Sequence, residues 1–171
     1  MIKGNKGEWS ELYVLLRLLA YGKIYAADDQ VKKIENVYFP ILKIIREEVK
    51  GKRLEYKIGE NEDVDIYSND VKIKSISKER LKKEADYLYN EIVNMKSRSF
   101  EIEQTEKFAN EIECYRLSAP STDKTDIKIQ IHDIHTGFEP VCGFSIKSEL
   151  GSAPTLLNAS GATNFVFEVD G

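Results

Sequence analysis

The sequence predicts a single α/β domain of the mixed α+β type, and three observations favour this fold class. Apolar residues follow a helical spacing over residues 7–21, short β-like runs fill residues 23–76, and two runs within residues 125–148 alternate between apolar and polar side chains. With 171 residues, 42% of them hydrophobic, the chain is long enough to bury a substantial core. Its four prolines and mixed composition exclude collagen-like and low-complexity architectures.

Composition also limits the partners and the location of the protein. Twenty-five basic residues against 29 acidic ones give a net charge of -4, so any site for a polyanion must be assembled locally. The longest apolar stretch, residues 12–21, is interrupted by Arg17 and is too short to span a bilayer. Cys114 and Cys142 have no CxxC spacing and predict reduced thiols rather than a disulfide scaffold. We therefore expect a cytoplasmic protein with no membrane partner.

A first helix is predicted over Gly7–Tyr21, with Gly22 placed to end it. Its apolar side chains point in nearly every direction, which predicts burial; they are Trp9, Leu12, Tyr13, Leu15, Leu16, Leu18 and Leu19. Glu11 lies among them. A buried carboxylate is costly unless it is paired or binds a cation, which makes Glu11 a candidate functional residue. A partly exposed glutamate near the helix start explains its position equally well.

The middle of the chain predicts strands and then helices. The strand-like runs cover residues 23–25, 37–45, 53–58, 64–67 and 71–76. An amphipathic helix follows, with Ser77 as its N-cap and apolar residues from Leu81 to Met95 at spacings of four and three. A further helix is predicted over Ile102–Cys114 and leads into a loop at residues 120–124. Since no internal repeat or linker interrupts the sequence, we expect one domain over residues 1–171.

Two alternating runs near the end predict a β-hairpin. Residues 125–133 read TDIKIQIHD and residues 141–148 read VCGFSIKS, each with apolar side chains on one face only. A four-residue loop would pair Ile134 with Glu139 and set Asp126 directly beside Lys147, about 5 Å apart at Cβ. Such a pair either holds Mg²⁺ and stabilises charge on a phosphoryl group, or is an ordinary cross-strand ion pair.

Three strings resemble the HpaII family of type II restriction endonucleases over the whole chain: GNKGEWSELYVLLRLLAYGKIY near the start, KTDIKI, and GFSIKSELGSAPTLLNASGATNF near the end. The resemblance implies a PD-(D/E)xK core, in which helices flank a central mixed sheet, with a late strand at residues 164–169. It also implies Mg²⁺-dependent hydrolysis of double-stranded DNA containing CCGG. Because members of the family continue beyond the position of Gly171, it predicts an amino-terminal fragment or a truncated relative.

The resemblance also implies site residues. Asp126 matches the metal-binding acid of the family and Lys147 the lysine of the (D/E)xK element. Ser145 stands where the superfamily usually has an acid, so a second metal-binding carboxylate is expected elsewhere. Glu11 is preferred because nucleases of this class often carry a glutamate on their first helix; Glu149 is the alternative, since it shares the face of Ser145 and Lys147 by strand parity.

We therefore predict a sequence-specific DNA endonuclease whose oligomeric state is open, a homodimer included. Ser145 or Gln130 would orient water, and the candidate DNA contacts are Gln130, Asn158, Thr163 and Asn164. Two alternatives remain: a non-cleaving DNA-binding or protein-interaction module on the same fold, and a structure-directed repair nuclease. A zinc site at His132, His135 and Cys142 is disfavoured, because residues three apart on a strand face opposite ways.

Overall fold

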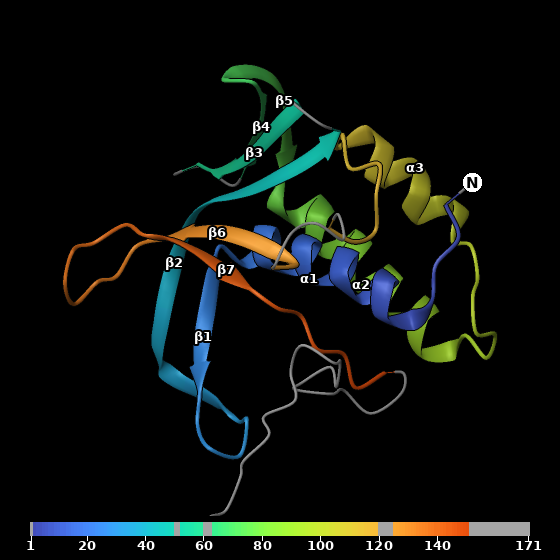
Figure 1. Ribbon diagram of the computed structural model, residues 1–171, viewed down its shortest axis with the longest axis horizontal. Coiled ribbons are helices and arrows are strands. Elements are labelled where there is room, and N and C mark those ends of the chain that lie inside the picture. Colours follow the sequence, from blue (N-terminus) through green and yellow to red (C-terminus); the bar gives the residue numbers. More distant parts are fainter. Residues whose placement is uncertain (1, 50–51, 60–62, 120–124, 151–171) are drawn as a thin grey trace, which may run out of the picture.

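The computed structural model describes residues 2–49, 52–59, 63–119 and 125–150, which form three helices and seven strands (Figure 1). The helices are α1 (Lys6–Tyr21), α2 (Lys78–Asn94) and α3 (Glu103–Glu111). The strands are β1 (Lys23–Ala27), β2 (Lys33–Val49), β3 (Lys52–Ile58), β4 (Asp63–Ser68), β5 (Val71–Ser77), β6 (Ile127–Ile131) and β7 (Val141–Phe144). The mixed α+β class is thus confirmed, whereas the predicted strand at residues 164–169 and the predicted loop at residues 120–124 lie outside the described residues.

The strands form one sheet in the order β5-β4-β3-β2-β6-β7, and β1 pairs with β2. The long strand β2 pairs with β1 through its first half and with both β3 and β6 through its second half. Every pairing between the described strands is antiparallel. The prediction of a mixed sheet is therefore wrong for this part of the chain, since most neighbours are joined by short connections that only antiparallel strands allow.

Local signals at the helix ends agree with the sequence. Asn5 caps α1 through a reciprocal capping box with Glu8, and Gly22 ends the helix with φ of 67°, a left-handed conformation that favours glycine. The hydroxyl of Ser77 accepts from the backbone N–H of Arg80 at the start of α2, as predicted. Both helices therefore begin and end within two residues of their predicted bounds at these caps.

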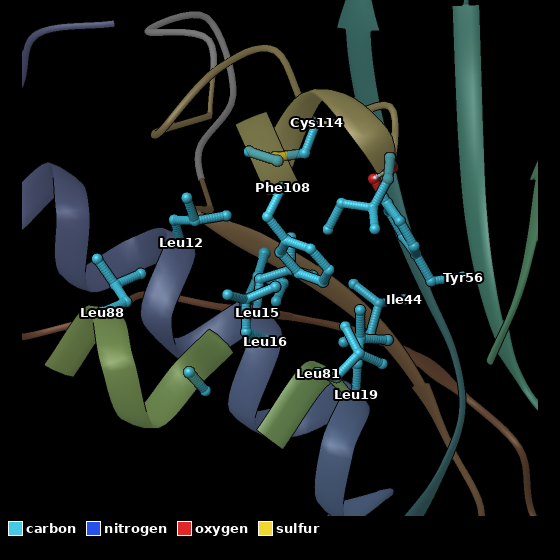
Figure 2. Close-up of a cluster of buried hydrophobic side chains, with 14 of the residues drawn as sticks. Leu12, Leu15, Leu16, Leu19, Ile44, Tyr56, Leu81, Leu88, Phe108 and Cys114 are labelled. Atoms are coloured by element: carbon cyan, nitrogen blue, oxygen red, sulfur yellow. Dashed lines mark hydrogen bonds between the residues drawn. The ribbon is translucent and has the colours of Figure 1, made fainter. Parts of the chain in front are cut away.

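The core lies between the sheet and the pair α1 and α2, which pack against each other along their length (Figure 1). Figure 2 shows side chains that meet in this core: Leu12, Leu15, Leu16 and Leu19 of α1, Leu81 and Leu88 of α2, Ile44 of β2, and Tyr56 of β3. Trp9 is fully buried, and its Nε1 donates to the Phe100 carbonyl at 3.2 Å. Burial of each large apolar side chain contributes about 1.5–3 kcal/mol, so α1 is held firmly on the sheet. None of the described helices is long and apolar enough to cross a membrane.

The hairpin of β6 and β7 forms with the predicted faces but in a different register. Ile127 pairs with Phe144 and Ile129 with Cys142, so the ladder is shifted by two residues from the predicted one. Pro140 has no N–H to donate to a longer ladder, and the residues before it fold into a turn in which the Gly137 N–H donates to the Asp133 carbonyl at 2.7 Å. The predicted pairs of Asp126 with Lys147 and of Ile134 with Glu139 are therefore wrong.

Candidate active site

Asp126 lies immediately before β6 and is tied to the chain that follows β7. Its backbone N–H donates to the Phe144 carbonyl at 3.0 Å, and its Oδ2 accepts from the Ile146 N–H at 2.6 Å. The second bond uses a backbone donor beyond the end of the ladder, so the carboxylate is fixed between the two strands. Asp126 is half-buried, with its side chain at the margin of the sheet rather than within the core.

Glu11 projects from α1 toward the same margin. Its Oε2 accepts from the Ala119 N–H at 3.3 Å. The pKa of Glu11 is raised from its ordinary value of 4.5 to about 7, mainly by burial and next by the negative charge of Asp126. The hydrogen bond from the Ala119 N–H and the positive charge of Arg46 lower this pKa, but by less. The fold thus brings the predicted carboxylates Glu11 and Asp126 together from a helix and a strand 115 residues apart in sequence.

A cavity of about 360 Å³ opens beside Asp126. Its described lining comes from the second half of β2, the start of β3, the chain before and along β6, and one residue of β7: Ile45, Arg46, Glu47, Arg53, Ala119, Thr125, Asp126, Ile127, Lys128 and Val141. Three of these side chains are basic and two are acidic. The cavity can therefore receive an anionic group next to a carboxylate, which is the combination that a phosphodiester and a divalent cation require.

The residues of the predicted (D/E)xK element lie beyond the end of β7. Extending the observed register places Ser145 opposite Asp126, where Lys147 was predicted. Ser145, Lys147 and Glu149 are exposed, and Lys147 is absent from the described cavity lining. This segment is nevertheless anchored, because the hydroxyls of Ser10 and Ser148 share a hydrogen bond of 2.9 Å that holds it against α1.

The remaining predicted site residues do not reach Asp126 or are not described. Gln130 Nε2 donates to the Glu139 carbonyl at 3.0 Å, and four strand residues, roughly 13 Å, separate it from Asp126. Asn158, Thr163 and Asn164 lie outside the described residues.

The predicted carboxylates Glu11 and Asp126 are not part of a larger cluster of metal-binding side chains in the described residues. Within residues 2–49, 52–59, 63–119 and 125–150, no three His, Cys, Asp or Glu side chains form a group able to hold a metal ion. Mg²⁺ can be held by one or two carboxylates together with water and substrate phosphate, and Glu11 and Asp126 are the predicted carboxylates at this site.

Sequence reasoning missed the basic residues of the cavity. Arg46 is the clearest case, because it follows the apolar pair Ile44 and Ile45 and its own side chain is only 9% exposed. A charged residue at a core-facing strand position is the signal that could have identified it.

Comparison with known proteins decides the family. The model of the HpaII restriction endonuclease family matches residues 5–171. The chain belongs to the HpaII restriction endonuclease family. It is 43% identical over 169 residues to the type II restriction enzyme HpaII of Haemophilus parainfluenzae, a match that covers 97% of this chain and 46% of that relative. The chain therefore spans about half the length of this HpaII-family enzyme, and no solved structure matches it.

Glu11 gives this HpaII-family chain a predicted pH dependence. A carboxyl whose pKa is raised by folding binds its proton more tightly in the native state, so its contribution to stability is present below pH 4.5 and is lost as the pH rises to about 7. In metal-free buffer, Glu11→Gln should flatten the fall in unfolding free energy between these pH values. Urea unfolding across this pH range measures it, with Glu8→Gln, a cap residue of the same helix, as the comparison. Parallel pH profiles for the unchanged chain and Glu11→Gln would contradict the assignment.

Proposed function

We propose that this chain carries the catalytic centre of a type II restriction endonuclease that hydrolyses phosphodiester bonds in double-stranded DNA. One observation carries the proposal: in a chain of this family, Asp126 lines a cavity that has both acidic and basic walls, and its negative charge also acts on Glu11. In the reaction, the oxygen of water bonds to phosphorus, one P–O ester bond breaks, and the departing oxygen takes up a proton. The chain is proposed to be one domain, the amino-terminal part of a longer enzyme.

Glu11 and Asp126 would together hold Mg²⁺. The metal would supply electrostatic stabilisation of the phosphoryl oxygens and a more acidic water. A cation also explains why two carboxylates are kept at one site, because it offsets both the burial of Glu11 and its repulsion by Asp126. Glu149 remains a proposed further ligand of the metal.

Lys147 is proposed to place its ammonium against the scissile phosphate. Its exposure leaves the charge accessible to DNA, and the Ser10–Ser148 bond limits the movement of the segment that carries it. Ser145, opposite Asp126, is proposed to orient the attacking water. Gln130, Asn158, Thr163 and Asn164 remain proposed DNA contacts.

The substrate proposed is duplex DNA containing CCGG, as the resemblance to the family implies, and the proposed location is the cytoplasm, where reduced thiols such as Cys114 and Cys142 are expected. Palindromic substrates are often bound by two copies of a protein, so a homodimer is included in the proposal. The net charge of -4 is compatible with DNA binding only through local basic sites such as the cavity wall.

The test uses two duplexes of equal composition, one with CCGG at its centre and one with CGCG. With Mg²⁺ the unchanged chain should cut the first and spare the second, and EDTA should stop the reaction. Cutting of branched DNA irrespective of sequence would instead indicate a repair nuclease.

A non-cleaving DNA-binding module is the second candidate, and the segment after β7 favours it. Ser145, not an acid, stands opposite Asp126, and Lys147 lies outside the described cavity lining. Tight binding of the CCGG duplex, with no cutting at any concentration of Mg²⁺ or Mn²⁺, would support the module and contradict the endonuclease.

A further inference from the structure

Arg46 is a charged residue that β2 directs into the protein. Its strand neighbours at two-residue spacing, Ile44 and Glu48, also face inward and are 0% and 1% exposed. The Arg46 side chain is 9% exposed. Burying a guanidinium is unfavourable unless a partner compensates its charge, so a residue that only stabilised the fold would be better replaced by an apolar one.

Two hydrogen bonds hold the guanidinium in one orientation. Its Nε donates to Glu48 Oε1 at 2.7 Å, and its Nη2 donates to the Arg116 carbonyl at 3.0 Å. Glu48 is in turn fixed, because its Oε2 accepts from the Tyr115 N–H at 3.0 Å. The strand and the chain around residues 115–116 thus preorganise the Arg46 cation before any ligand binds.

Arg46 lines the same cavity as Asp126. The charge of Arg46 also acts on Glu11, so the cation shares a cavity with Asp126 and influences the carboxylate of Glu11. A phosphate that enters this cavity to reach Asp126 therefore comes close to the planar donors of Arg46, whose geometry matches phosphate oxygens.

We propose that Arg46 is a catalytic residue of this site, whose guanidinium donates to a non-bridging oxygen of the scissile phosphate, with Glu48 as its positioning residue. The inference rests on the proposed function and deepens it. Hydrolysis spreads negative charge over the phosphoryl oxygens, and a cation already fixed in a buried position stabilises that charge without reorganising. An exposed lysine such as Lys147 would have to be ordered first.

The experiment compares two double variants that leave the net charge of the chain unchanged. Arg46→Met with Glu48→Gln removes the proposed contact, and the two changes are made together so that no buried charge is left unpaired. Arg80→Met with Glu111→Gln removes the exposed pair between α2 and α3, whose atoms lie 2.5 Å apart. Duplex affinity is measured in EDTA over a range of salt concentrations. Single-turnover cutting is then measured with Mg²⁺.

Loss of one phosphate contact should reduce the slope of log affinity against log salt by about one for the Arg46 double variant only. Its cutting rate should fall by about 10²-fold, as for removal of one transition-state donor. Because net charge is constant, a purely structural role would leave the salt slope unchanged, and an unchanged slope and rate would overturn the proposal.

The outcomes also separate this inference from the proposed function. If the unchanged chain binds the duplex but never cuts it, the endonuclease proposal fails, while the salt slope in EDTA still decides whether Arg46 contacts phosphate. If it cuts and the Arg46 double variant cuts equally well, only the inference fails. A chain that binds no duplex overturns both.

Discussion

Replacing Asp126 with asparagine is expected to lower Mg²⁺-dependent cutting of the CCGG duplex by about 10³-fold, within the range for loss of one essential acid–base or electrostatic group. Asparagine keeps an oxygen that can accept from the Ile146 N–H, so the hairpin should stay folded. It removes the negative charge that, in the proposed site, would help to hold a metal. Single-turnover cutting, with duplex binding in EDTA measured alongside, tests the prediction, and binding should change little.

The same hairpin offers a matched control for this variant. Asp133 lies in the turn between β6 and β7, where its carboxylate accepts from the His135 N–H at 2.9 Å and from the Thr136 hydroxyl at 2.8 Å. Asp133→Asn changes the charge identically and should cut at the rate of the unchanged chain. A second measurement does not depend on cutting: because Asp126 raises the pKa of Glu11, that pKa should fall in Asp126→Asn. A cutting rate equal to that of the unchanged chain would contradict the assignment of Asp126.

Helix α1 could be predicted from the sequence, because its position and ends depend on residues that are close together in the chain. The helix over Gly7–Tyr21 was predicted from apolar spacing and Gly22, and α1 begins one residue earlier because Asn5 is its cap. Glu11 was found from a mismatch, a carboxylate within an apolar helix, and the structure gives it the unfavourable setting that the mismatch indicated. A residue that opposes its own local pattern is therefore a candidate for a functional role.

The hairpin register shows what alternation cannot determine. Alternation of apolar and polar residues fixes the face of the sheet on which each side chain lies, but the pattern is satisfied equally by any shift of one strand along the other by an even number of residues. Here Pro140 and the turn at Asp133–Gly137 select the register, and they move Ser145, rather than Lys147, opposite Asp126. Position along the strand decides which groups meet at a site, so the predicted pair failed although its predicted face was right.

Arg46 was missed because its setting is nonlocal. The strand predicted over residues 37–45 ended one residue before it, whereas β2 continues to Val49. The partner carbonyl belongs to Arg116, 70 residues away, and the cavity is completed by the chain around Asp126. The strand pattern can mark Arg46 as a charged residue at a core-facing position, but it does not identify these partners, because they come together only when β6 pairs with the second half of β2.

Arg46→Met alone is expected to lower the free energy of unfolding by about 3–5 kcal/mol. The change leaves the carboxylate of Glu48, whose side chain is 0% exposed, without its cation and with the Tyr115 N–H as a remaining donor. Adding Glu48→Gln should recover most of the loss, because the amide keeps an acceptor for that N–H and no charge stays unpaired. Urea unfolding of the two single variants and the double variant measures the coupling between the residues.

Arg80→Met is the control, because it breaks an arginine–glutamate ion pair that is exposed to water rather than buried. Arg80 and Glu111 form a bidentate pair, but the Arg80 side chain is 48% exposed, so its loss should cost less than about 1 kcal/mol. Equal effects of the two arginine substitutions would mean that Glu48 is reached by water and that the Arg46 pair is not held as described. The expected result is a large loss of unfolding free energy in Arg46→Met and its recovery when Glu48→Gln is added. It would show that an uncharged pair at these positions folds nearly as well as the charged pair. That is expected if the guanidinium is retained for contact with a ligand rather than for stability.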